Sequence, residues 1–189
     1  MNPLARTWAT ALTWGSTAEE RALRFACDEF AGETRDALYR AVTVSAPPAV
    51  LFRWLCQLRA APYSYDWLDN PGRRSPRTLT PGLDRLQDGQ PVMTIFRLAA
   101  FETGRHITAV LHSTGLLFDQ LAVTYLIVPG ADERCRLVVK IAVTYPRNLI
   151  GAAMRILLPA GDLVMARKQL LTLKALSERD ASGVQPHGI

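Results

Sequence analysis

Between residues 91 and 144 the apolar positions of this chain alternate with polar ones, which is the period of a half-buried β-strand. Glycine or proline turns divide this region into four segments. The pattern predicts four strands, at Phe96–Ala100, Ile107–Leu111, Val123–Ile127 and Leu137–Val143. Since short turns join consecutive strands, we expect an antiparallel meander with its apolar faces on one side of a sheet.

The segment before these strands predicts two helices and one more strand. Ser16–Glu19 has the pattern of a capping box, which indicates a short helix over about residues 17–25. A β-branched, alternating strand over Leu38–Val44 comes next. The helix after it is predicted over residues 48–58, with Pro48 at its first position.

The last long segment, Asn148–Ser177, has helical spacing and carries six large apolar residues on or near one predicted face. They are Leu149, Ile156, Leu163, Leu170, Leu171 and Leu176. We expect Pro159 and Gly161 to kink this helix or to split it in two.

The order of elements predicts one α+β domain in which a curved antiparallel sheet packs on a long C-terminal helix. Such an arrangement leaves room for an internal apolar cavity between the two layers. We assign residues 1–37 to an N-terminal extension, 38–178 to the domain and 179–189 to a disordered tail. A chain of 189 residues, 49% of them hydrophobic and 21% charged, is typical of a single globular domain.

The formal net charge of +5 raises the question of a polyanionic partner. Arg73, Arg74 and Arg77 cluster in a glycine- and proline-containing loop, but no aromatic residues interleave with these cations. Nucleic-acid surfaces usually combine the two, so we expect a solvated surface and no nucleic-acid partner.

Cysteine usage and hydropathy indicate a cytoplasmic protein without a membrane span. Cys27, Cys56 and Cys135 are odd in number and far apart, which favours reduced thiols. The most apolar stretch is interrupted by Arg155 and Asp162, among others, so no transmembrane helix is predicted.

The motifs of several enzyme classes are absent from the sequence. It contains no nucleophile elbow, P-loop or dinucleotide-binding glycine pattern. On a regular strand His106 and His112 would lie about 20 Å apart, too far to share a metal ion. We therefore expect no cofactor and no metal site.

Aromatic and aliphatic residues are the candidates for binding a ligand. Tyr63, Tyr65 and Trp67 recur at a spacing of two within the long connection 61–89, so they either lie over a cavity mouth or seal the core. The other predicted lining residues come from the inner faces of the strands and from the last helix. They are Phe96, Leu98, Leu111, Tyr125, Leu137, Val139, Ile141, Val143 and Met165.

Four segments of the chain resemble the START-like SRPBCC superfamily of polyketide cyclase/dehydrase and lipid-transport proteins, in particular an uncharacterised bacterial subgroup. The first is the strand-to-helix junction Arg40–Pro48, which continues into Phe52–Leu55. The others are Trp14–Thr17, the tyrosine-rich loop 63–74, and residues 158–168. The resemblance extends over most of the chain, from about residue 14 to residue 178.

The resemblance implies a helix-grip fold of the START/Bet v 1-like type with a hydrophobic cavity. It leaves two functions open, because one fold hosts many activities. In the first, the cavity binds a small hydrophobic molecule such as a lipid or polyketide. In the second, a cofactor-free cyclase or aromatase uses the same cavity, with Tyr65, Tyr125 and Tyr145 as candidate catalytic phenols. Neither the identity of the ligand nor the oligomeric state follows from the sequence.

Overall fold

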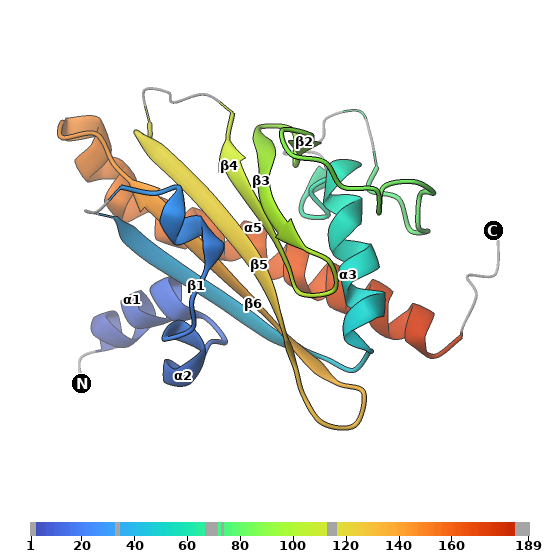
Figure 1. The fold of residues 1–189 in the computed structure, drawn as a ribbon. Helices are drawn as coiled ribbons and strands as arrows, with labels where there is room; N and C mark the ends of the chain where they lie inside the picture. The colour runs from blue at the N-terminus through green and yellow to red at the C-terminus, as the bar shows by residue number, and fades with distance from the viewer. Residues whose placement is uncertain (1–2, 33–34, 67–71, 73, 113–116, 184–189) are drawn as a thin grey trace.

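A six-stranded antiparallel sheet dominates the computed structural model, which describes residues 3–32, 35–66, 72, 74–112 and 117–183 (Figure 1). Its strands follow the order β1-β6-β5-β4-β3-β2, so the first strand pairs with the last and the others form a meander. Their bounds are β1 Asp36–Val44, β2 Pro91–Val92, β3 Phe96–Glu102, β4 His106–Leu111, β5 Gln120–Pro129 and β6 Cys135–Thr144. The five predicted strands are confirmed, and the two-residue strand β2 was not predicted.

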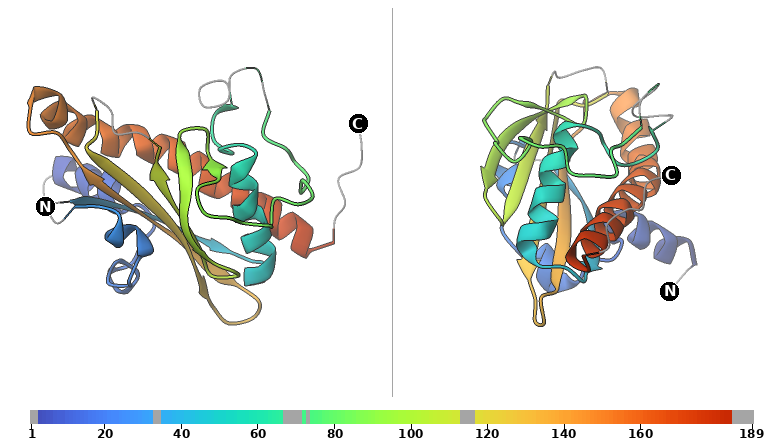
Figure 2. Two further views of the ribbon diagram at one scale, coloured as in Figure 1. Left: turned by 45° about the horizontal axis from the view of Figure 1, so that its top comes forward. Right: turned by 90° about the vertical axis from the view of Figure 1, so that its right-hand side faces the viewer.

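Two helices pack on the same face of this sheet. Helix α5, Leu149–Ala181, lies along the sheet, and helix α3, Pro48–Cys56, packs beside its C-terminal half (Figures 1 and 2). The indole Nε1 of Trp54 in α3 donates a hydrogen bond of 3.0 Å to Asp180 in α5. Pro48 stands in the first turn of α3, as predicted.

Helix α5 continues without a break through Pro159, so of the two predicted outcomes, a kink or a split, the split is wrong. A proline inside a helix removes one backbone hydrogen bond and crowds the preceding turn. Here Pro159 is buried, and its carbonyl accepts a hydrogen bond from Arg40 of β1 at 3.2 Å. Packing on the sheet therefore holds the helix together at this position. The helix also extends four residues past Ser177, into the segment that we predicted as a tail.

The N-terminal segment forms more structure than its sequence pattern indicated. An unpredicted helix, α1 (Pro3–Thr13), precedes the capping box. The capping box begins at Thr17, one residue later than predicted. The backbone N–H of Glu20 donates to the Thr17 hydroxyl, and the backbone N–H of Thr17 donates to the Glu20 carboxylate. Helix α2 is a single turn, Ala18–Arg21, and is shorter than predicted because the chain then turns into the 3₁₀ helix η1, Ala26–Glu29.

The central strands are buried on both faces, which a purely one-sided alternation did not predict. On the helical side, Tyr125 and Val139 belong to the main hydrophobic core together with residues of α3 and α5. On the opposite side, Leu126 and Val138 belong to a second cluster, which Phe25 and Cys27 cover. The cavity described below lies on the helical side.

Candidate functional site

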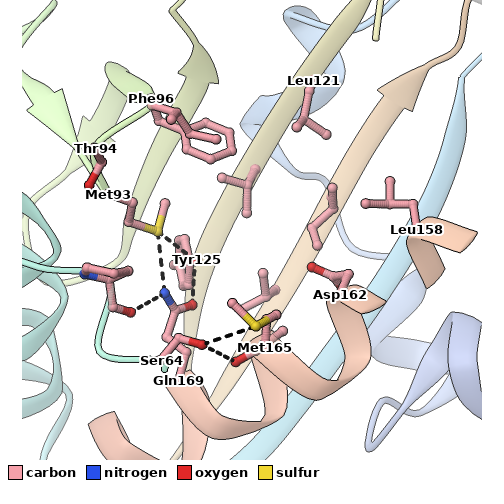
Figure 3. Close-up of a pocket in the computed structure, with 16 residues that line it drawn as sticks. Ser64, Met93, Thr94, Phe96, Leu121, Tyr125, Leu158, Asp162, Met165 and Gln169 are labelled. Carbon is pink, nitrogen blue, oxygen red and sulfur yellow. Dashed lines mark hydrogen bonds between the residues drawn. The ribbon is translucent and has the colours of Figure 1, made fainter. Parts of the chain in front are cut away.

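A cavity of about 370 Å³ lies between the sheet and the middle of α5 (Figure 3). Most of its walls are aliphatic or aromatic, and polar atoms enter at a few positions only. The sheet supplies Phe96, Leu121, Val123, Tyr125, Val139 and Ile141, helix α5 supplies Leu158, Asp162, Met165, Ala166 and Gln169, and the loops supply Pro62, Ser64, Met93, Thr94 and Ile95.

The structure places five of the predicted ligand-binding residues on the cavity wall. They are Phe96, Tyr125, Val139, Ile141 and Met165. Leu98 and Leu137 are buried in the main core, which also contains Trp54 of α3, and do not line the cavity. Leu111 is half-buried at the end of β4 and Val143 is buried near the end of β6, and neither lines the cavity. The strand period indicated the inward face, but α3 fills one end of that face and the cavity occupies the middle.

The tyrosine-rich loop contributes less to the cavity than the spacing of Tyr63, Tyr65 and Trp67 suggested. Tyr63 has a left-handed backbone with φ of 57°, so the extended alternation on which the prediction depended is broken there. Its ring packs edge-on against Trp54 with centroids 6.0 Å apart, and burial raises the pKa of Tyr63 to about 12. Tyr65 is half-buried and does not line the cavity, and Trp67 lies outside the described residues.

Tyr125 and Gln169 form a hydrogen-bonded pair on one side of the cavity (Figure 3). The Tyr125 hydroxyl donates to Gln169 Oε1 at 2.7 Å, and Gln169 Nε2 donates to the carbonyl of Pro62 at 2.6 Å. Burial raises the pKa of Tyr125, so the phenol stays neutral and remains a donor. The pair thus links β5, α5 and the loop after α3.

We expect Tyr125→Phe to destabilise the protein by about 1–3 kcal/mol, because it leaves the buried Oε1 of Gln169 without its donor. Urea denaturation monitored by circular dichroism measures this loss. Tyr65→Phe is the matched control and is expected to change the stability by less than about 0.5 kcal/mol, since Tyr65 is half-buried outside the cavity. Equal losses for the two variants would contradict the role of the pair.

A charged pair that the sequence analysis missed lies on the wall at Asp162. One guanidinium nitrogen of Arg40 is 2.8 Å from the Asp162 carboxylate, and the Arg40 side chain is fully buried. Arg40 also donates to the carbonyl oxygens of Tyr39 and Pro159. Burial raises the pKa of Asp162 and lowers the pKa of Arg40, while the attraction between the two charges opposes both shifts.

Comparison of the fold with solved structures identifies an aromatase/cyclase, ZhuI from Streptomyces sp. R1128, with a TM-score of 0.53. The match covers 77% of this chain and 94% of that protein at 14% sequence identity. This chain has a START-like fold. The predicted α+β helix-grip architecture is therefore confirmed, with its curved sheet and long C-terminal helix.

Two further structures match this chain at lower TM-scores. Norcoclaurine synthase from Thalictrum flavum gives 0.49 at 12% identity, over 78% of this chain and 96% of that one. A START superfamily protein from Mycobacterium smegmatis gives 0.44 at 20% identity, over 79% and 99%. No family model matches the sequence, and neither does any curated protein.

The described residues contain no group of three or more histidine, cysteine, aspartate or glutamate side chains that could hold a metal ion. One of the two histidines considered above, His112, accepts a hydrogen bond of 2.5 Å at Nδ1 from the guanidinium Nε of Arg97. Cys27, Cys56 and Cys135 are buried and unpaired. The cytoplasmic location and the absence of a cofactor remain predictions.

The sequence held a signal for Asp162 that was interpreted only as an interruption. Leu158, Asp162, Met165 and Gln169 recur at i, i+4, i+7 and i+11, which is one stripe of a helix, and all four line the cavity. Of the six apolar residues predicted on or near one face of this helix, Leu170 and Leu176 are buried in the main core, whereas Leu149, Ile156 and Leu171 are exposed. Leu149 is 89% exposed, so that part of the prediction is wrong.

Proposed function

We propose that this START-like protein binds one small, largely apolar molecule in the cavity between its sheet and helix α5. The observation that carries the proposal is a cavity of about 370 Å³ with mainly apolar walls between the sheet and helix α5. Ligand pockets usually measure about 300–1,000 Å³. The cavity lies near the lower end of that range, which favours a compact molecule over a long two-chain lipid.

Two polar positions would orient such a ligand. The Asp162 carboxylate can accept a hydrogen bond from a ligand hydroxyl, and the Tyr125–Gln169 pair offers a second polar contact. Because Arg40 balances the charge of Asp162, the cavity suits a neutral ligand better than a charged one.

Leu158 and Leu157 offer a matched pair of variants, because they are neighbours on α5 but point in different directions. Leu158 lines the cavity, whereas Leu157 is 63% exposed. We expect Leu158→Trp to fill part of the cavity and to weaken the binding of the neutral fluorophore N-phenyl-1-naphthylamine at least about tenfold, a loss of about 1.4 kcal/mol. Leu157→Trp should leave the affinity unchanged.

A fluorescence titration, with thermal melts to confirm that both variants fold, measures this difference. Non-saturable binding, or equal affinities for the two variants, would contradict the proposed site. Native mass spectrometry of the purified protein would then identify the chemical class of any molecule that it carries.

An enzymatic alternative rests on the titratable groups of the cavity. Of the three candidate phenols, Tyr125 alone lines it, while the ring of Tyr145 lies tilted against Phe118 and under the guanidinium of Arg155. Acid–base chemistry on a bound ligand would therefore fall to Tyr125 and Asp162. Turnover of a recovered ligand that Tyr125→Phe abolishes, while binding persists, would favour the enzyme. Unchanged turnover would argue against this role.

A further inference from the structure

The first half of α5 exposes an apolar surface that no described part of the chain covers. We call it the outer face. It consists of Leu149, Ala153, Ile156, Leu157, Ala160 and Val164. Leu149 is 89% exposed, Ile156 and Leu157 are each 63% exposed, and Val164 is 55% exposed. Large contiguous patches of exposed apolar surface are uncommon on monomeric proteins and mark interaction sites.

The charged side chains in this half of α5 point away from the outer face. An ordinary surface helix exposes a polar face and buries its apolar face, so the arrangement here is reversed. The Nε atom of Arg155 lies 2.6 Å from a carboxylate oxygen of Asp36 in β1, and the carboxylate of Asp162 pairs with the guanidinium of Arg40. The outer face therefore has no charged residue over 16 positions from Leu149 to Val164, about 24 Å at 1.5 Å per residue. The most apolar 18-residue window of α5 has a mean hydropathy of 1.6 with 17% of it buried, so by length and composition alone the helix could cross a membrane.

A membrane-spanning role does not fit the way α5 packs. Its opposite face carries the buried residues Gly151, Pro159 and Ala166, and Leu170 and Leu173 continue that face into the main core. Inserting the helix across a bilayer would strip it from the sheet. The outer face can therefore meet a lipid surface only from the side.

Cations flank the outer face at both ends. Arg147 precedes the helix, and Arg167 and Lys168 follow Val164, all three exposed. The guanidinium of Arg167 lies 5.7 Å from the centre of the Trp14 ring. No ion pair within the described part of the chain involves these three cations, so their charge is available to a partner.

We propose that the outer face of α5 docks on an anionic lipid surface. Apolar helix faces bind at the boundary of headgroups and acyl chains, and flanking cations add attraction to anionic lipids. A second copy of the chain fits less well. Pairing two outer faces in either direction would bring cations against cations, with no carboxylate on either face to balance them.

Docking would place the cavity wall beside the lipid. Leu158 lines the cavity and Leu157, its neighbour, belongs to the outer face. An apolar ligand could then pass between the bilayer and the cavity over a short path. The docking proposal does not depend on that exchange and can be tested without any ligand.

A fluorophore on the outer face reports docking directly. Because Cys27, Cys56 and Cys135 are buried, Leu157→Cys introduces an exposed thiol that an environment-sensitive nitrobenzoxadiazole label can modify selectively. We expect blue-shifted, brighter emission with phosphatidylcholine vesicles that contain phosphatidylglycerol. Affinity should fall at least tenfold with pure phosphatidylcholine, and should also fall in high salt. The same label at Leu23→Cys, a 39%-exposed position near η1, is the control and should not respond.

Unlabelled protein tests the same surface by flotation with anionic vesicles. The triple variant Ile156→Ser, Leu157→Ser and Val164→Ser should lose at least tenfold in binding, as should Arg167→Gln with Lys168→Gln, while the melting temperatures stay near that of the parent protein. Absence of vesicle binding would overturn the proposal. So would equal binding to neutral vesicles, an equal response of the Leu23→Cys label, or an emission shift that grows with protein concentration without lipid, which would indicate a second copy.

Discussion

Asp162→Asn is expected to destabilise the protein by about 3 kcal/mol or more, because it leaves the charge of Arg40 buried without its counter-ion. The Arg40 side chain is 0% exposed, so water cannot take over the role of the carboxylate. Urea denaturation of the purified variant measures the change. An exposed ion pair provides the comparison: Glu102→Gln, which breaks the pair with Arg105 at the surface, should change stability by less than about 1 kcal/mol.

A double variant separates loss of charge balance from loss of packing. Arg40→Met with Asp162→Leu removes both charges and keeps apolar volume, so we expect it to be markedly more stable than Asp162→Asn alone. If the double variant is as unstable as the sum of its parts, the pair does not act as a unit. The pair also bears on the proposed function, because it sets one charged but balanced point on a mainly apolar cavity wall.

Much of the fold could be predicted because local patterns and tertiary packing agree there. The alternation in β3 to β6 matches the period of a strand, and Pro48 begins α3 because its missing N–H is not needed in a first turn. Helix α1 and the one-turn α2 were missed or misjudged because their bounds depend on how the N-terminal segment packs. The unbroken path through Pro159 likewise depends on contacts with β1 that no local pattern contains.

The site was harder to predict than the fold. Strand period identified Tyr125 and Val139 on the inner face, but only the placement of α3 decides which part of that face is filled and which is hollow. Helix α5 is apolar on two sides, so hydrophobicity alone could not fix its phase. The polar residues Asp162 and Gln169 mark its inner side, because a buried polar group needs a partner that only the core provides.

The segment Trp14–Thr17 shows how a short motif can record tertiary contacts. The carbonyl of Trp14 accepts a hydrogen bond of 3.0 Å from the N–H of Ala41 in β1, and the Thr17 side chain caps α2. Between them Gly15 has φ of 75°, and a Cβ placed there would lie 2.1 Å from the carbonyl oxygen of Ala41. The chain thus turns directly against the strand, one residue from the buried Arg40.

Gly15→Ala is accordingly expected to destabilise the protein by about 3 kcal/mol or more. A left-handed backbone at alanine accounts for about 1–2 kcal/mol of this loss, and displacement from Ala41 accounts for the rest. Gly104→Ala isolates the first part, since Gly104 has φ of 78° and open space where its Cβ would be. Urea denaturation of both variants gives the difference. Equal losses would mean that the segment can move away from β1 freely, and that the close approach at Ala41 does not hold the N-terminal segment on the sheet.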